Sequence, residues 1–453
     1  MRRHLEGEVE PRGERMIESL ERGFTIAARD VRRAPRKEPR GFVVSAAGSL
    51  VEARVPAARI GDGCVFDCGV RGEIVAFKSG LARVLVLGTA SGLGPGTGIR
   101  ACGGLKVRAG APLLGRVVGA DGQPIDGGPP LEESGAIETI PLERPAPDPL
   151  RRRPIRTRLV TGVRAIDALC PMGRGQRIGL FAGPGVGKST LLGDLAAGAA
   201  VDVVVAALIG ERGREVKEIL EGPLAAAKDR SVVVVAPGDS PPLARARATV
   251  TATAIAEHFR GCGASVLLLV DSLTRYARAL REIGLAAGEA PARGGFPPSV
   301  LASLPKIIER AGPDEEGEIT AIYTVLCEEE GATDALADEV RGLVDGHLIL
   351  ARHLAERDHW PAIDIPASIS RVARDVASET ELTAAAVVRR RIAAYEERRD
   401  LVVLGAYQRG DAEADAAVES WPRIEAFLKQ RAGTHAPFAE TAKALESLSG
   451  VSQ

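Results

Sequence analysis

One segment near the middle of the chain restricts its possible folds more than any other. In Gln176–Thr190 (QRIGLFAGPGVGKST) an apolar run leads into a glycine-rich turn, and a lysine and two hydroxyl residues follow it. Glycines let successive backbone N–H groups point toward one centre, and a helix that begins there adds a partial positive charge. The segment therefore predicts a strand, a phosphate-binding loop and a helix, in that order.

The residues of this loop predict a site for a nucleoside triphosphate with Mg²⁺. Lys188 can reach the β- and γ-phosphates, and the Ser189 hydroxyl can ligate the metal ion. The usual pattern begins with glycine, whereas this chain has Ala182, which fits if its backbone is not left-handed. A chance glycine-rich turn is the alternative. The predicted nucleotide-binding residues of the loop are Gly183, Pro184, Gly185, Val186, Gly187, Lys188, Ser189 and Thr190.

Two further segments supply groups that triphosphate hydrolysis requires. The apolar run Val266–Val270 ends in Asp271, about 80 residues after the loop, and such a strand-end acid can complete the metal site. The segment Ala206–Glu215 (AALIGERGRE) places Glu211 and Arg212 just beyond another strand. There a carboxylate can polarise water and an arginine can hold the γ-phosphate. Spacing alone favours an ordinary surface Glu–Arg pair.

Composition argues against several classes of function. Lys and Arg total 59 against 60 for Asp and Glu, so no overall basic field favours nucleic acid, and aromatic residues make up only 3%. The six cysteines lack zinc-site spacing, which predicts reduced thiols in a cytosolic protein. No run reaches the roughly 18 apolar residues of a membrane span, and the charged N-terminus does not resemble a signal peptide. We therefore expect neither export nor membrane insertion.

The chain divides into four stretches by composition. Residues 1–40 carry 11 basic and 8 acidic side chains, which predicts a solvated tail or an arm that touches a membrane surface or a partner. Residues 41–107 hold short apolar runs between Gly and Asp, which predict a small β-barrel or sandwich. Residues 108–375 include a Pro- and Arg-rich linker and then alternate strand-like and helix-like runs, which predict a mostly parallel sheet with helices on both faces. Residues 376–453, rich in Ala, Glu and Arg, predict a helical domain.

The expected strands are short and are bounded by Gly, Asp or Pro. In the first β-rich stretch they are Phe42–Val44, Leu50–Val55, Val70–Phe77 and Leu81–Leu87. In the α/β stretch they are Gln176–Phe181, Asp202–Ile209, Ser231–Ala236, Ser265–Val270 and Ile319–Leu326, with helices expected at Lys188–Ala200 and Pro242–Arg260.

Five segments together identify a family. They are Gly179–Thr190, Leu208–Val216 (LIGERGREV), Leu267–Ala277 (LLLVDSLTRYA), Gly288–Pro298 (GEAPARGGFPP) and Pro361–Val372 (PAIDIPASISRV). This ordered set resembles the ATPases of type III secretion systems, both flagellar export ATPases and injectisome ATPases, which are similar in turn to the catalytic subunits of rotary ATP synthases. The resemblance runs from about Gly41 to Gln430.

The resemblance implies the α/β fold class, with a central RecA-like P-loop ATPase domain between an N-terminal β-barrel and a C-terminal α-helical domain. It implies a Mg²⁺-dependent ATPase in which Lys188 binds phosphate and Ser189 ligates the metal ion. Glu211 resembles the catalytic glutamate and Arg212 a γ-phosphate contact. Asp271 matches the strand-end acid, and Glu215 the residue that helps to hold the water shell of the metal ion.

Arg371, in the sequence SISR, matches the family arginine that reaches into the site of a neighbouring subunit. That role implies a homo-hexameric ring with ATP at its interfaces, since a chain's own nucleotide would lie beyond the reach of this side chain. Such an arginine finger contributes about 10³–10⁵ in rate by stabilising transition-state charge. Without the family, a structural ion pair is the more ordinary interpretation.

Two positions depart from the family pattern. The family usually has a tyrosine where this chain has Trp360, and an indole can also stack on adenine, so Trp360 joins the predicted nucleotide-binding residues, with core packing as the alternative. Glu328–Gly331 (EEEG) replaces the Glu-Gly-Asp-Asp type of turn that the family commonly has, so the resemblance does not extend to ligand contacts near that turn. The segment Gly284–Pro298, with Arg293 and Phe296 near its tip, matches a loop that faces the hole of the ring; a flexible surface loop is the alternative.

The implied function is to energise type III protein export, by releasing and unfolding chaperone-bound cargo at the cytoplasmic face of the inner membrane. The implied partners are a peripheral stalk or regulator protein, a central stalk protein, export chaperones, cargo and the export gate, and no nucleic acid. The sequences Arg293–Phe296 (RGGF) and Ala362–Ile365 (AIDI) slightly favour an injectisome over a flagellum.

Three alternatives belong to other classes. A hexameric RNA translocase of the transcription-termination type would share the RecA-like core, yet residues 41–107 offer only Phe42, Phe66 and Phe77 for stacking on bases. A catalytic subunit of a rotary ATP synthase would carry an acidic stretch near its C-terminus, which is not visible in this chain. A purely structural scaffold would not need the catalytic and metal-binding residues named above.

Overall fold

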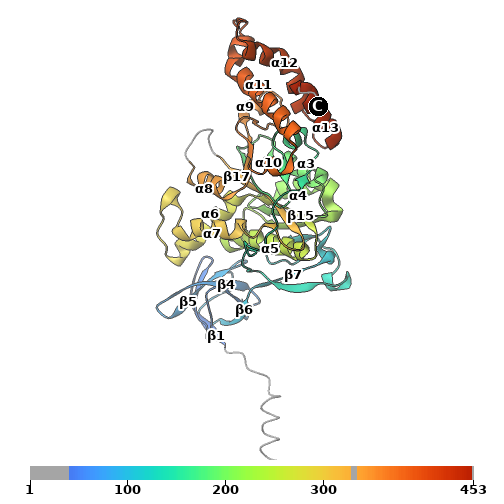
Figure 1. Cartoon of the computed structure of the whole chain (residues 1–453). Coiled ribbons are helices and arrows are strands. Elements are labelled where there is room, and N and C mark those ends of the chain that lie inside the picture. Colours follow the sequence, from blue (N-terminus) through green and yellow to red (C-terminus); the bar gives the residue numbers. More distant parts are fainter. Residues whose placement is uncertain (1–39, 328–333, 451–453) are drawn as a thin grey trace, which may run out of the picture.

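A computed structural model describes residues 40–327 and 334–450 of the chain. A strand-rich part, a mixed α/β part and a helical part lie end to end (Figure 1). The predicted fold class, with its barrel, its ATPase-type sheet and its C-terminal helices, is therefore confirmed. The N-terminal arm as far as residue 39 and the turn at residues 328–331 lie outside the described residues.

The strand-rich part is a closed antiparallel barrel with the order β1-β2-β5-β4-β3-β6. Alternate side chains point inward, so Val51, Ile74 and Val84 are fully buried in its core. Irregular pairing within β1, β4 and β6 bends these strands, which helps a sheet of this size to close. The strands are β1 (Gly41–Ala47), β2 (Leu50–Arg54), β3 (Asp62–Phe66), β4 (Arg71–Lys78), β5 (Leu81–Val86) and β6 (Gly98–Gly104).

The middle part is built on a sheet with the order β19-β18-β12-β17-β15-β13-β14-β8, and β16 pairs beside β17. Every pair is parallel except β18 with β19 and β16 with β17. The predicted α/β strands each fall within one residue or so of an observed strand. The strands are β8 (Val117–Gly119), β12 (Arg177–Ala182), β13 (Val203–Ile209), β14 (Ser231–Ala236), β15 (Ser265–Asp271), β16 (Gly312–Pro313), β17 (Glu318–Leu326), β18 (Gly346–Leu350) and β19 (Ile369–Ser370).

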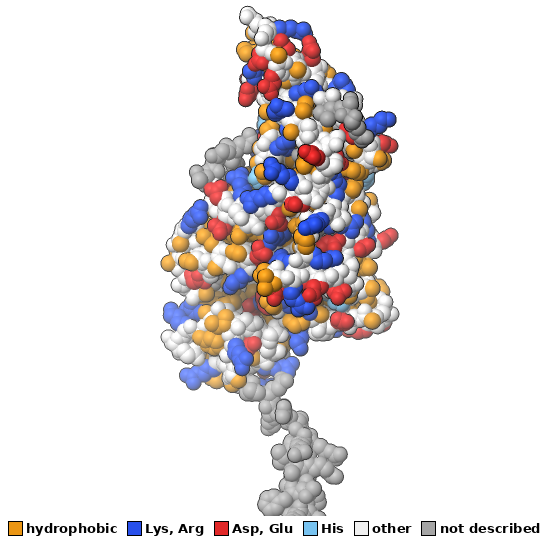
Figure 2. Space-filling model, viewed as in Figure 1, with side chains coloured by type: hydrophobic (Ala, Val, Ile, Leu, Met, Phe, Trp, Pro, Cys, Tyr) orange, Lys and Arg blue, Asp and Glu red, His pale blue; other side chains and the backbone are white. Residues whose placement is uncertain are grey.

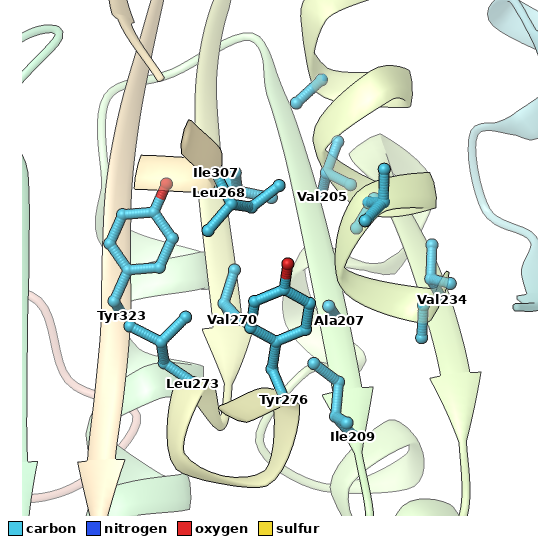
Figure 3. Close-up of a cluster of buried hydrophobic side chains, with 14 of the residues drawn as sticks. Val205, Ala207, Ile209, Val234, Leu268, Val270, Leu273, Tyr276, Ile307 and Tyr323 are labelled. Carbon is cyan, nitrogen blue, oxygen red and sulfur yellow. The ribbon is translucent and has the colours of Figure 1, made fainter. Parts of the chain in front are cut away.

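Helices cover both faces of this sheet, as buried parallel strands require. Val205, Ala207 and Ile209 of β13 enter the core beneath α5, α6 and α7, where Tyr276 and Tyr323 also pack (Figure 3). Val204 and Leu208 point to the opposite core, beneath α2 and α3. The helices are α2 (Arg164–Leu169), α3 (Lys188–Gly198), α4 (Gly213–Glu221), α5 (Pro242–Gly261), α6 (Leu273–Ala287), α7 (Pro298–Ile308), α8 (Ala335–Leu343), α9 (Arg352–Ala355) and α10 (Ala373–Val376).

An ordered linker connects the barrel to the sheet. It contains β7 (Lys106–Ala109), which pairs with β9 (Glu138–Pro141), and β10 (Arg158–Leu159), which pairs with β11 (Met172–Gly173). Three consecutive arginines, Arg151 to Arg153, bond to carbonyl and carboxylate oxygens of residues 309–318. The domain boundaries predicted at residues 107 and 375 stay predictions. The strand β7 runs across the first of these boundaries. Short 3₁₀ turns lie at Ala111–Leu113, Leu131–Glu133, Ala225–Arg230 and Arg293–Gly295.

The helical part packs α11 (Glu379–Val403) against α12 (Ala412–Leu428) and α13 (Phe438–Ser449). A capping box begins α11: Ser378 and Glu381 satisfy each other's backbone N–H groups. The Tyr395 and Trp421 rings stack with centroids 4.0 Å apart, joining α11 to α12.

The face of the molecule that Figure 2 shows bears charges of both signs side by side, which agrees with the near-zero net charge. Within residues 40–327 and 334–450, none of the helices is long and apolar enough to span a bilayer.

Candidate active site

The glycine-rich loop lies at the carboxyl end of the parallel strands. β12 ends at Ala182, in extended backbone, so the alanine at the first position of the pattern is accommodated. Gly185 and Gly187 have φ angles of 78° and 83°, in the left-handed region that favours glycine. α3 begins immediately afterwards at Lys188. The predicted strand, loop and helix therefore occur in the predicted order.

The loop is built to receive an anion. Across the described residues, the N–H groups of Gly185, Val186 and Gly187 find no hydrogen-bond acceptor. A Cβ atom added at Gly185 would meet nothing within 4 Å, so the space beside the loop is open. Free donors at a helix N-terminus beside open space fit the phosphates of a nucleotide.

Charged side chains from three strand ends meet beside this loop. The Lys188 ammonium contacts Oδ1 of Asp271 at the end of β15, and it lies 3.7 Å from Oε1 of Glu211, just beyond β13. Nε of Arg275, in the first turn of α6, lies 3.5 Å from the same Glu211 oxygen. Asp271 is 2% exposed and Glu211 is 7% exposed. The structure therefore brings together Lys188, Glu211 and Asp271, as the sequence predicts.

The electrostatics of Glu211 suit a group that exchanges a proton with water. Burial raises the pKa of the Glu211 carboxyl, and the nearby Asp271 and Glu215 carboxyls raise it further. The Lys188 ammonium and the Arg275 guanidinium oppose this shift without cancelling it. A carboxylate with a raised pKa is a stronger general base than one in open water.

The residues predicted to hold Mg²⁺ fit that ion. Oδ2 of Asp271 is buried and has no hydrogen-bond partner in the part of the chain that the structure describes. Ser189 lines the same small cavity as Asp271. Among residues 40–327 and 334–450, no group of three or more His, Cys, Asp or Glu could hold a metal ion. Sparse protein ligation is typical of Mg²⁺, which keeps waters and binds substrate phosphates.

Arg212 and Glu215 lie at the edge of the cluster. The Arg212 side chain is 81% exposed, and its Nη1 lies 3.3 Å from a Glu215 oxygen. The structure therefore does not bring the Arg212 guanidinium beside Lys188. Glu215 lies in the first turn of α4, close enough to Glu211 to raise its pKa.

Trp360 lies directly against the phosphate loop. A Cβ atom added at Gly187 would come within 2.8 Å of the indole ring, so only glycine admits the ring at this distance. The indole N–H donates to Oδ1 of Asp358 (2.8 Å), and the Trp360 carbonyl accepts from the N–H of Gln430 (2.8 Å). The Trp360 residue is 36% exposed, so it is partly packed and partly open to solvent.

Arg371 lies at the other end of the sheet. It follows β19, whose Ser370 pairs with Gly346 at the start of β18. In the parallel pairing of β18 with β12, Gly346 lies at the same height as Ile178, near the start of β12. The loop at Gly183 is about five residues further along the strand, or roughly 16 Å. The Arg371 side chain is exposed, and its Nη2 donates to the Arg341 carbonyl (3.2 Å). The structure therefore separates Arg371 from the P-loop of its own chain.

Sequence reasoning missed two residues that contact the cluster. Arg275 contacts Glu211, and the Thr324 hydroxyl on β17 donates to Oδ1 of Asp271 (2.8 Å). For Arg275 a signal existed, because a cation one turn after a strand-end acid lies at the same edge of the sheet. Thr324 carried no signal, since its place depends on how β15 and β17 pair. In the loop at 284–298, Arg293 lies 3.6 Å from Glu339 while Phe296 is buried.

The fold and the site define a P-loop ATPase of the ATP synthase type. The family model "ATP synthase alpha/beta family, nucleotide-binding domain" matches residues 162–370, and "T3SS EscN ATPase C-terminal domain" matches residues 377–447. The chain belongs to the type III secretion ATPase family, and it is an ATP-hydrolysing enzyme of that family.

Individual relatives cover nearly the whole chain. The flagellum-specific ATP synthase of Bacillus subtilis is 43% identical, over 90% of this chain and 95% of the relative. The type 3 secretion system ATPase of Xanthomonas euvesicatoria is 45% identical, over 90% and 93%. The structure of the assembled ATPase EscN from enteropathogenic E. coli aligns with a TM-score of 0.85 at 43% identity, over 90% of this chain and all of that one. EscN has also been solved in complex with its central stalk EscO.

Proposed function

We propose that this chain energises type III protein export by hydrolysing ATP at the subunit interfaces of a homo-hexameric ring. The observation that carries the proposal is the separation of two half-sites on one sheet. Lys188, Glu211 and Asp271 lie at the carboxyl end of the strands, and Arg371 is exposed at the opposite end. A neighbouring copy can supply the arginine that a chain's own fold keeps away.

In this proposal each side chain has a separate task. The loop N–H groups and Lys188 bind the β- and γ-phosphates, and Trp360 stacks on adenine. Glu211 accepts the proton of the attacking water, helped by its raised pKa. Arg212 turns from Glu215 toward the γ-phosphate, and Arg371 of the adjacent copy stabilises the charge of the transition state.

Ser189 and Asp271 would hold Mg²⁺, with Glu215 holding its water shell. The bound ion would neutralise charge that develops on the phosphates. Before ATP binds, Lys188 neutralises the same carboxylates, which keeps this buried acidic cluster stable. When the triphosphate binds, the Lys188 ammonium would turn from these carboxylates to the phosphates.

The ring would act with a central stalk protein, a peripheral stalk or regulator, export chaperones and their cargo, at the export gate on the cytoplasmic face of the inner membrane. The assembled EscN and its complex with EscO support the ring and the central stalk by similarity. We propose release and unfolding of chaperone-bound cargo as the work done. The injectisome remains our slight preference over the flagellum, on the two short sequences named above.

ATPase rate against protein concentration tests the shared site. We expect specific activity to rise with concentration until rings have assembled, because each site needs two chains. A flat line down to extreme dilution would contradict the proposal. Single-stranded RNA, added in parallel, should leave the rate unchanged, whereas strong stimulation would favour the RNA translocase.

A further inference from the structure

The strand segment Ser368–Arg371, which contains β19, is held on one side by the central sheet. The Ser368 hydroxyl donates to the Asp364 carbonyl (2.6 Å) and accepts from the N–H of Ile349 (3.0 Å). β19 then pairs with β18, and the N–H of Arg371 donates to the Asp345 carbonyl (3.0 Å). These bonds attach one side of the backbone that leads to Arg371 to the edge of the sheet.

On its other side the same strand is held by one arginine of the helical part. Arg389, on α11, donates from Nη2 to the Ser368 carbonyl (2.8 Å). Its Nη1 donates to the carbonyl of Leu169 (3.1 Å), the last residue of α2. A single half-buried guanidinium thus joins three elements: α11, the end of α2 and the strand that leads to Arg371.

We propose that Arg389 is a positioning residue for Arg371: it ties the strand of Arg371 to α11, so that the helical part sets where that guanidinium points. The proposal rests on the proposed function, in which Arg371 completes the site of a neighbouring copy. The planar guanidinium is suited to this task, because its fixed fork can satisfy two carbonyl oxygens at once.

Packing alone does not make this connection. A cavity of about 280 Å³ lies between the strand and the helical part, and Ile369, Ser370, Ala385 and Ala386 line it. The strand is therefore not pressed against α11 by side chains over this stretch. Without Arg389, the Ser368 carbonyl would lose its charged donor and the strand would gain room to shift. A misplacement of about 1 Å in a group that acts on the reaction can reduce the rate about 10²-fold.

Other contacts hold the helical part in place and do not touch this strand. Nη2 of Arg158 lies 2.9 Å from a Glu381 oxygen, and the Arg158 guanidinium covers the Phe438 ring at 4.3 Å. Nε of Arg164 donates to the Phe427 carbonyl (2.9 Å). Removal of the Arg389 side chain should therefore leave the domains docked while it loosens the strand of Arg371.

The test compares three full-length variants with the wild type. In Arg389→Ala we expect kcat for ATP to fall by about 10–100-fold with KM changed less than about twofold, since the nucleotide is bound at the far end of the sheet. The kcat of Arg389→Lys should lie between those of the wild type and Arg389→Ala, because an ammonium cannot reproduce the forked geometry of the guanidinium. Arg390→Ala, at an exposed neighbouring position on α11, is the matched control and should behave as the wild type. Thermal unfolding verifies that all variants fold.

Arg371→Ala, alone and combined with Arg389→Ala, completes the test. If Arg389 acts through Arg371, the double variant should be no slower than Arg371→Ala alone. A further loss in the double variant, a selective rise in KM, or an Arg389→Ala variant with wild-type kcat would overturn the positioning role while leaving the shared site intact. An Arg371→Ala variant with wild-type turnover would instead remove the shared site itself, and the positioning role with it.

Discussion

Each end of the central sheet buries a carboxylate, and the two carboxylates differ in how they are paired. At the amino end, both oxygens of Glu257 accept from Arg310 (2.7 and 2.8 Å), and Arg310 also donates to the Leu142 carbonyl. At the carboxyl end, Oδ2 of Asp271 and Nε of Arg275 are buried without a hydrogen bond in the described structure.

This difference distinguishes buried charges that stabilise the fold from buried charges that act on a ligand. A buried ion pair with both partners satisfied holds its elements together, and removing one partner leaves a buried charge alone. A buried polar atom without a partner is unusual, and beside a phosphate-binding loop a bound ion or ligand can complete its bonding. Changes in the cluster of Lys188, Glu211 and Asp271 should therefore abolish turnover, and changes in the Glu257–Arg310 pair should reduce stability.

The largest expected effect is that of Lys188→Ala. Its ammonium is the only protein cation that contacts both Asp271 and Glu211 among the described ion pairs, and in the proposed reaction it binds phosphate. We expect turnover to fall by about 10⁴-fold or more, measured as phosphate release. Lys217→Ala, which removes an exposed lysine on α4, is the control and should keep wild-type turnover. Substantial activity in Lys188→Ala would mean that the phosphates bind elsewhere.

Next comes Glu211→Gln, which keeps the shape of the side chain and removes its basicity. Turnover should fall by about 10²–10⁴-fold, the usual contribution of a general base. Binding of a fluorescent ATP analogue should persist, because the loop and Lys188 are unchanged. Glu221→Gln, at an exposed position on α4, should alter neither quantity. If Glu211→Gln hydrolyses ATP at the wild-type rate, another group activates the water.

At the amino end, Arg310→Met tests the comparison by its effect on the free energy of unfolding. It leaves the Glu257 carboxylate buried and unpaired, which should lower the free energy of unfolding by about 3–5 kcal/mol. Turnover per folded molecule should stay near that of the wild type. Urea denaturation measures the loss, and Arg151→Met, which removes an exposed ion pair with Glu315, should cost only about 0–1 kcal/mol. Equal losses of stability in the two variants would show that the buried ion pair contributes no more to stability than the exposed one.

The smallest effect expected is a pH-dependent gain in stability of Glu211→Gln. Because the pKa of Glu211 is raised in the folded protein, the folded state binds more protons than the unfolded state between the ordinary value of 4.5 and the raised value. The free energy of unfolding of the wild type therefore falls as pH rises through that window. Above the window the ionised, buried Glu211 lowers this free energy by its full amount. Glutamine lacks the penalty, so the variant should melt higher than the wild type at pH 7–8, with the gap closing toward pH 5. A gap that does not change with pH would contradict the assignment of the shift to Glu211.

Much of this arrangement follows from local sequence. The P-loop and the strand ends at Glu211 and Asp271 are readable because apolar runs followed by Gly or Asp mark where parallel strands stop. β3 (Asp62–Phe66) and β6 (Gly98–Gly104) were not predicted, since their glycines and charged residues lower the apparent strand propensity and only closure of the barrel makes them strands.

Other features depend on pairing between distant segments. Arg275 and Thr324 reach the cluster because α6 and β17 lie beside β15, which no local pattern specifies. The placement of Arg371 requires the register of β19 against β18 and of β18 against β12. The direction of the Arg212 side chain depends on its ion pair with Glu215, a contact that the local sequence does not specify.

The most direct test mixes two defective proteins, Lys188→Ala and Arg371→Ala, each nearly inactive by itself. The Lys188→Ala protein keeps Arg371, and the Arg371→Ala protein keeps Lys188 in its phosphate loop. A mixed ring therefore contains some interfaces at which both residues are present. At equal amounts about a quarter of the interfaces in a cyclic ring should be complete, and ATPase activity should recover toward that fraction. Activity that stays at the level of the separate variants, after co-assembly has been verified, would show that each chain hydrolyses ATP without its neighbour.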